Sequence, residues 1–170
     1  AAGLHGATMA TRRELDPDSL QRADAALELV GMAALADRRG TAVSEGEWKR
    51  ARLARALVLE PELLLLDEPC SGLDLAQRER FLDTLDAALG PPGGPTAVLV
   101  THHLDEISTA TISQALLLAD GRVVAAGSVE ATITSPLVSR TFGMPVEVEH
   151  RRGRLSAHRT PAASGDPTTT

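Results

Sequence analysis

The chain has 170 residues, of which 43% are hydrophobic and 24% charged, as in an ordinary globular domain with a sizeable core. Its net charge of −6 and isoelectric point near 5.3 argue against a nucleic-acid-binding protein, which usually carries a basic surface. No apolar run reaches the roughly 18 residues of a membrane-spanning helix. The single cysteine, Cys70, excludes an internal disulfide, so we expect a cytoplasmic protein. Because the chain begins with Ala1 and not Met, we also expect residues upstream.

The sequence before residue 60 predicts two helices. Asp16 can cap a helix that begins at Pro17, since proline is favoured in the first helical position, and Gly31 can end it. A second helix is predicted over residues 45–59, just before a proline. The remaining segments are predicted to be irregular: a loop at 1–15, a short apolar piece at 32–36 and a turn at 38–40.

Two apolar runs predict strands. Residues 63–66, four leucines between two prolines, have too little room for a helix, and an uninterrupted run of this kind indicates a strand covered on both faces. Residues 96–101 form a second run, richer in β-branched side chains. A helix is predicted over 75–89, and strand, helix and strand in this order indicate parallel pairing. The apolar side of that helix is expected to hold Leu75, Phe81, Leu82, Leu85 and Leu89.

The last third of the chain predicts hairpins. Asp120-Gly121 separates two apolar runs and is a strong signal for a two-residue hairpin turn. A short helix is predicted over 135–142, and alternating residues on either side of residues 151–153 predict an edge hairpin. The composition of the tail, residues 160–170, fits a disordered segment.

Residues 43–47, Val-Ser-Glu-Gly-Glu, open the second helix. Ser44 and Glu47 have the spacing of a capping box, in which each side chain satisfies the other's backbone N–H. A helix start with free N–H groups, and with Gly46 permitting a close approach, is also suited to receive a phosphate. Both interpretations stay open from these residues alone.

Asp67 and Glu68 follow the leucine strand directly. In open α/β sheets, ligands bind beyond the carboxyl ends of parallel strands, so these acids are candidates for a site. Neighbouring residues of a strand face opposite sides, which would give the two carboxylates different tasks. Asp67 could hold Mg²⁺ through its water shell, and Glu68 could polarise an attacking water. The simpler alternative is two acids that solvate the end of a strand.

Two further segments follow the strands. Residues 71–74, Ser-Gly-Leu-Asp, form a tight turn in which Asp74 can cap the next helix. His102 and His103 come directly after the second strand. A metal site formed by these histidines with Asp105 and Glu106 is a rival interpretation, although adjacent side chains diverge.

The order and spacing of residues 43–74, with His102 after the second strand, resemble the signature, Walker B, D-loop and H-loop motifs of ATP-binding cassette (ABC) ATPases. The resemblance implies that Ser44 and Gly46 contact the γ-phosphate of ATP held by a partner domain. It makes Glu47 the polar fifth residue of the signature, with Glu45 in place of its usual first glycine. The remaining implied roles are Mg²⁺ binding for Asp67, water activation for Glu68, γ-phosphate contact for His102 and a place in the D-loop for Asp74.

The phosphate-binding loop of this family, G-x-x-x-x-G-K-[ST], is not in the chain. Its one lysine, Lys49, lies in Glu-Trp-Lys-Arg, and the glutamine loop would also precede the signature by more residues than are present. The resemblance therefore implies a P-loop-NTPase-like α/β core, a parallel sheet flanked by helices, that is incomplete at its N-terminus. We expect a partial domain over residues 1–159, with a helical signature subdomain at about 10–60 and the Walker B to C-terminal strands at 61–150.

The function that the resemblance implies is that of the ATP-hydrolysing subunit of an ABC transporter. ATP and Mg²⁺ would be its cofactors, and its partners would be a second ABC ATPase domain and membrane-spanning subunits, at the inner face of the cell membrane. The alternatives are a non-transport ABC protein that acts on ribosomes or DNA, and a regulatory half-domain. Because phosphoryl transfer depends on positioning by a whole site, we expect the chain alone to be inactive.

Overall fold

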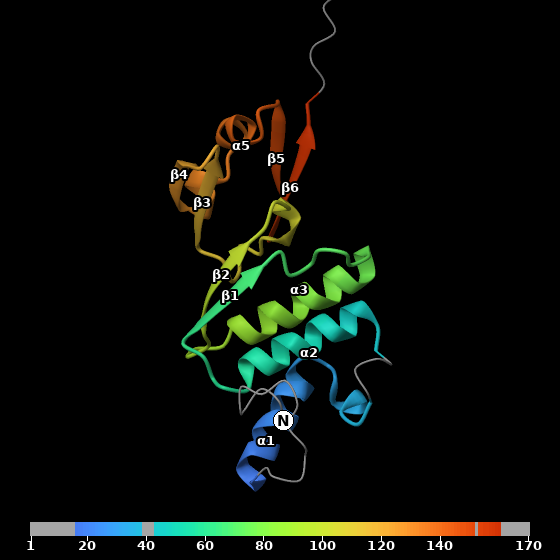
Figure 1. Cartoon of the computed structure of the whole chain (residues 1–170). Helices are drawn as coiled ribbons and strands as arrows, with labels where there is room; N and C mark the ends of the chain where they lie inside the picture. Colours follow the sequence, from blue (N-terminus) through green and yellow to red (C-terminus); the bar gives the residue numbers. More distant parts are fainter. Residues whose placement is uncertain (1–15, 39–42, 152, 161–170) are drawn as a thin grey trace, which may run out of the picture. The chain divides into compact units, whose positions relative to one another are not determined.

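The structure is a computed structural model that describes residues 16–38, 43–151 and 153–160 (Figure 1). The chain forms two compact units, of which the first ends at His102 and the second begins at His103. The predictions for the loop at 1–15, for most of the turn at 38–40 and for the tail after residue 160 fall outside the described residues.

The first unit opens with helix α1, Pro17–Leu29. Asp16 caps it: its two carboxylate oxygens accept hydrogen bonds from the Ser19 backbone N–H at 2.8 Å and from the Ser19 hydroxyl at 2.7 Å. The chain leaves the helix at Gly31, whose φ of +67° is favourable only for a residue without a side chain. Both predicted ends of this helix are confirmed, and the apolar piece that follows is a 3₁₀ turn, η2, Ala33–Leu35.

Helices α2, Glu45–Leu57, and α3, Leu75–Leu89, pack together in the same unit. Helix α2 ends two residues before the predicted end, and α3 has the predicted bounds. Phe81 and Leu82 of α3 are buried, but Leu75 is 68% exposed, so its expected place on the apolar side is wrong. Leu75 is the first residue of the helix, where the chain has only just left the exposed cap residue Asp74.

Strands β1, Leu63–Asp67, and β2, Thr96–Val100, pair in parallel, as predicted, with Leu63 opposite Thr96 and Asp67 opposite Val100. Helices α2 and α3 lie on one side of this pair (Figure 1). Leu64 is therefore buried while Leu65 is 69% exposed, and the prediction of a strand covered on both faces is wrong. The core of the unit consists of Ala26, Val30, Met32, Leu53, Ala54, Val58, Leu64, Cys70, Phe81, Leu82 and Leu85.

The second unit begins with a 3₁₀ turn, η4, Leu104–Glu106, and then forms the predicted hairpin from β3, Gln114–Ala119, and β4, Arg122–Ser128. Asp120 and Gly121 both have positive φ, 50° and 69°, as a two-residue turn of type I′ requires. A four-residue helix that was not predicted, α4, Val129–Thr132, follows the hairpin.

Helix α5, Ser135–Phe142, has the predicted bounds, and the second hairpin is formed by β5, Val146–Arg151, and β6, Arg154–Arg159. Both strands extend two residues beyond the alternating runs of the sequence, 146–149 and 154–157. Their unit has its own core, which consists of Leu104, Val129, Ile133, Val138, Val146 and Leu155. Within the described parts of the chain, no helix combines the length and the apolar character needed to cross a membrane.

Candidate functional site

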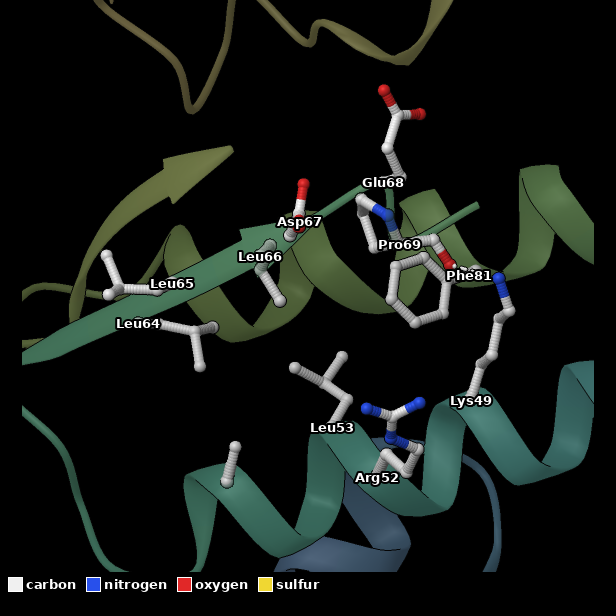
Figure 2. A pocket seen from close by; sticks show the side chains of 11 residues that line it. Lys49, Arg52, Leu53, Leu64, Leu65, Leu66, Asp67, Glu68, Pro69 and Phe81 are labelled. Carbon is white, nitrogen blue, oxygen red and sulfur yellow. Dashed lines mark hydrogen bonds between the residues drawn. The ribbon is translucent and has the colours of Figure 1, made fainter. Parts of the chain in front are cut away.

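The two acids lie where β1 ends. Glu68 continues the ladder for one more step, because its N–H donates to the carbonyl oxygen of Val100 at 2.9 Å. Its φ of +45° is a left-handed conformation that is uncommon for a residue other than glycine. This change of conformation breaks the alternation of the strand, so both carboxylates point away from α2 (Figure 2). The expectation that Asp67 and Glu68 face opposite sides is therefore wrong.

His102 contacts Glu68. The ring Nδ1 lies 2.7 Å from Glu68 Oε1, and since an ionised carboxylate can only accept, the ring nitrogen donates. The two residues come from the ends of neighbouring parallel strands, which meet at one edge of the sheet. The side chains are 64% and 34% exposed, and an exposed pair of this kind contributes at most about 1 kcal/mol to stability. The contact therefore orients the two side chains more than it stabilises the fold.

The other oxygen of this carboxylate, Glu68 Oε2, is buried and has no hydrogen-bond partner among the described residues. A buried acceptor without a donor is rare in folded proteins and calls for an explanation. The missing donor would have to come from outside the described residues, for example from a water molecule. Water activation is the role that the resemblance implies for Glu68.

Asp67 is exposed at the last position of β1. In the part of the chain that the structure describes, no group of three or more His, Cys, Asp or Glu residues could hold a metal ion. The rival metal site proposed for His102 and His103 is therefore not formed there. A cation at Asp67 would need oxygens from water and phosphate to complete its shell. Mg²⁺ is usually bound in this way, through one or two carboxylates, so the residue fits it.

The first turn of α2 has the predicted capping box. The Ser44 hydroxyl accepts from the Glu47 N–H at 3.3 Å, and Glu47 Oε2 accepts from the Ser44 N–H at 2.7 Å. This bond from the Ser44 N–H, aided by the Ser44 side chain, lowers the pKa of Glu47 below its ordinary value. The carboxylate of Glu47 is thus engaged within its own helix, and the Ser44 side chain lies exposed at the helix start.

Gly46, the second residue of α2, is buried. A Cβ at Gly46 would lie only 3.1 Å from the side chain of Gln77, so the missing side chain lets the first turn of α3 approach α2. The neighbouring Glu45 lies against the turn after the acids: its Oε1 would be 2.8 Å from a Cβ at Gly72, whose φ is +77°. Gly46 and Glu45 therefore both contact residues of this same chain.

The turn after the acids is also held from α2 by a residue that the sequence analysis did not assign to the site. Lys49 Nζ donates to the carbonyl oxygen of Pro69 at 3.0 Å and to that of Ser71. Asp74 caps α3 by accepting from the Gln77 N–H at 2.8 Å. Its spacing places Lys49 one helical turn after Glu45 on the same face of α2, but gives no sign of these backbone partners.

A pocket of about 230 Å³ lies between α2 and β1. Its walls include apolar side chains such as Leu53, Leu64 and Phe81, and Figure 2 shows the carboxylates of Asp67 and Glu68 pointing away from it. Pockets for small molecules usually measure about 300–1,000 Å³ and direct polar groups inward. The space between α2 and β1 is therefore not the expected nucleotide site, which lies on the side to which the acids point.

Comparison with known proteins gives one consistent result. Residues 4–71 match the family model described as "ABC transporter". The chain is 40% identical over 131 residues to the ABC transporter ATP-binding protein YlmA of Bacillus subtilis, which corresponds to 77% of this chain and 49% of that protein. It is 38% identical over 136 residues to the hemin import ATP-binding protein HmuV of Rhodococcus jostii, or 79% of this chain and 45% of that protein.

Solved structures agree with these sequence matches. An ABC transporter in an inward-facing conformation superimposes with a TM-score of 0.74 and 27% identity, over 96% of this chain and 63% of that one. The protein cbiO1 of Clostridium perfringens, part of the transporter complex cbiONQ, gives a TM-score of 0.64 and 27% identity, over 84% of this chain and 55% of that one. The chain spans about half the length of the curated relatives it matches.

Proposed function

Since the chain belongs to the ATP-binding cassette family, we propose that it provides the water-activating residues and the signature helix of a transporter's ATPase. The fold and the relatives support an ABC ATPase domain, and the individual roles rest on the geometry at the end of β1. The observation that carries the proposal is the contact between Glu68 and His102, which join two neighbouring strand ends at 2.7 Å.

In the proposed reaction, Glu68 polarises the water that attacks the γ-phosphate. Its Oε1 is held by His102, so the unpartnered Oε2 is the oxygen that can accept a hydrogen bond from this water. General-base assistance of this kind contributes on the order of 10²–10⁴ in rate. His102 would keep Glu68 in the required orientation, and its exposed ring would also contact a phosphate oxygen.

Asp67 would hold Mg²⁺ through water molecules of its shell, since its exposed carboxylate stands at the same strand end. When bound, the ion neutralises charge on the phosphates and so stabilises the transition state of phosphoryl transfer. The phosphate loop that cradles ATP would come from residues outside this chain, because Lys49, its one lysine, is engaged with the turn after the acids.

The start of α2 would serve a second nucleotide, bound to a partner ATPase domain. Exposed Ser44 can donate its hydroxyl hydrogen there, and the first N–H groups of the helix favour an anion. Gly46 would contribute through its backbone, since its Cα side is packed against Gln77, while Glu47 keeps the helix start in shape. Asp74, at the start of α3, would lie in the contact between the two domains.

Substitution of Glu68 in the full-length protein tests the proposal. Glu68→Gln keeps the size of the side chain but cannot take up a proton, so ATP turnover should fall below detection while ATP still binds. Turnover would be measured by phosphate release, and binding by titration calorimetry. An unchanged rate in this variant would remove Glu68 from its proposed role.

The isolated chain of 170 residues provides a second test. Because phosphoryl transfer depends on a whole site, it should bind ATP weakly and hydrolyse none measurably. Tight ATP binding by this chain in titration calorimetry would contradict the expectation.

The transporter role is tested by purification of the full-length protein from membranes. Membrane-spanning subunits should be recovered with it, in keeping with a location at the inner face of the cell membrane. Recovery with ribosomes instead would favour a non-transport member of the family.

A further inference from the structure

Lys49 connects two elements of the first unit. Its ammonium group extends from the second turn of α2 toward Pro69 (Figure 2) and donates to the carbonyl oxygens of Pro69 and Ser71. These carbonyls belong to the turn that follows Glu68 directly. Hydrogen bonds from a charged donor are stronger than those between neutral groups, so one side chain fixes both ends of this turn.

The turn after Glu68 depends on contacts with its surroundings. Glu68 has a left-handed φ of +45°, which costs on the order of 1–2 kcal/mol for a residue with a side chain. Such a conformation persists only where the surroundings enforce it. The turn has two hydrogen bonds of its own, from the Ser71 N–H to the Glu68 carbonyl and from the Leu73 N–H to the Cys70 carbonyl, each at 3.1 Å. Lys49 adds the contact from outside.

The same face of α2 makes two more contacts with this segment. Glu45, one helical turn before Lys49, lies against Gly72, and Gly46 lies against the side chain of Gln77. The first two turns of α2 and residues 69–77 are therefore packed as one piece. A displacement of the helix start would move the turn and, with it, the backbone of Glu68.

We propose that Lys49 is a positioning residue for ATP hydrolysis: it couples the helix start at Ser44 to the turn that sets Glu68. The inference rests on the proposed function, in which Ser44 contacts one nucleotide and Glu68 acts on another. Contact of Ser44 with a partner's phosphate would then reach the water-activating carboxylate through the packing of α2 on this turn, in which Lys49 provides the charged hydrogen bonds.

A set of three variants tests the inference on the 170-residue chain. Lys49→Met removes the charge and the donors, Lys49→Arg keeps both, and Arg55→Met makes the same kind of change at an exposed position in the last turn of the same helix. Lys49→Met should speed amide hydrogen exchange at Ser71 and Leu73 about tenfold, as expected for the loss of a charged hydrogen bond. Lys49→Arg should restore most of the protection, and Arg55→Met should change nothing there.

The same variants are then compared in the full-length protein. Lys49→Met should lower kcat by about tenfold while the KM for ATP stays within about twofold, because misplacement of a reacting group affects the chemical step. Lys49→Arg should recover at least half of the lost kcat. A mere loss of stability would instead reduce the fraction of folded protein, which a matched unfolding curve reveals.

Several outcomes would overturn the inference. Unchanged exchange at Ser71 and Leu73 would show that Lys49 does not hold the turn. Faster exchange with an unchanged kcat would show that the turn does not determine the position of the Glu68 carboxylate. If the unmodified full-length protein showed no ATP turnover, both the proposed function and the role of Lys49 in hydrolysis would be contradicted. The exchange experiment would then still report whether Lys49 holds the turn.

Discussion

Three acidic residues of the described chain adopt the left-handed conformation: Glu60 after α2, Glu68 after β1 and Asp120 between β3 and β4, with φ values of 49°, 45° and 50°. Glu60 lies just after the end of a helix, where left-handed residues are common. At Asp120 the conformation belongs to the hairpin, because a two-residue turn of type I′ requires positive φ at both positions. Aspartate tolerates it comparatively well, and Gly121 takes the second position. No hairpin geometry demands it at Glu68. There the conformation turns a carboxylate to the same side as Asp67.

The difference shows how a strained residue can be interpreted. Asp120 has a conformation that its turn type explains, so it carries no sign of function. Glu68 is longer and is followed by proline and not glycine. It contacts His102, and its other carboxylate oxygen is buried with no partner among the residues that the structure describes. Strain with no architectural reason therefore marks the site, in agreement with the clustering of such residues at functional positions. The following changes test this contrast.

The largest effect is expected when Glu68 loses its neighbour. His102→Ala in the full-length protein should lower ATP turnover by about 10² or more, since the carboxylate is no longer held in place. His103→Ala is the matched control, because His103 is also exposed but lies one residue further from β2. Phosphate release measures both rates. Equal rates in the two variants would show that His102 does not hold Glu68 in place for catalysis.

A smaller effect is expected at the architectural turn. Gly121→Ala should lower the free energy of unfolding by about 1–2 kcal/mol, because alanine at a φ of +69° is strained. This holds although, apart from the chain neighbours, no described residue has a heavy atom within 4 Å of the added Cβ. Urea unfolding of the 170-residue chain gives the value. ATP turnover of the full-length protein should not change, and a loss of turnover would contradict the separation of the two turns.

Relief of strain should differ between the two acids. In a chain that already carries His102→Ala, Glu68→Asn should raise the free energy of unfolding by about 0.5–1 kcal/mol, because asparagine adopts the left-handed conformation more easily. Asp120→Asn should change it by less than about 0.3 kcal/mol, since aspartate shares this tolerance. Equal gains from urea unfolding would mean that Glu68 is no more strained than Asp120.

The smallest effect is expected when the pH is lowered enough to protonate Glu47. The Ser44 N–H lowers the pKa of Glu47, so the ionised side chain stabilises the folded helix start. This contribution is complete above the ordinary pKa of 4.5 and is lost as the pH falls through the lower value of the folded state. The Ser44 amide resonance should therefore shift in that range. In Glu47→Gln, which keeps an acceptor but cannot ionise, the shift should be absent.

Much of the fold could be predicted because its signals are local. Asp16 and Gly31 mark the ends of α1, the Asp120-Gly121 pair defines a hairpin, and short runs of apolar residues locate both parallel strands. The exposure of Leu65 could not be predicted, since the coverage of a strand face depends on what packs against it. The short helix α4 was missed although Ser128 caps it and Glu130 lies in its first turn, because four residues are too few to show a helical apolar period.

For the candidate site, residue types could be predicted but local geometry could not. The acids and the capping box of α2 follow from their spacing. The left-handed φ of Glu68 does not, because glutamate has no preference for it and tertiary contacts decide. Lys49 was missed because a lysine on a helix is usually a solvated surface residue. Its partners are backbone carbonyls, which leave no trace in a pattern of side chains.

Trp48, which lies between Glu47 and Lys49, is the one tryptophan of the chain, and the chain has no tyrosine. The Trp48 side chain is 51% exposed. Ultraviolet emission excited near 295 nm therefore comes from a single indole within the first turn of α2, with no background from other residues. Docking of another domain onto the start of this helix would shield the indole from water and shift its emission to shorter wavelength. The molecule thus contains its own optical reporter of assembly, placed next to Ser44, and no dye has to be attached.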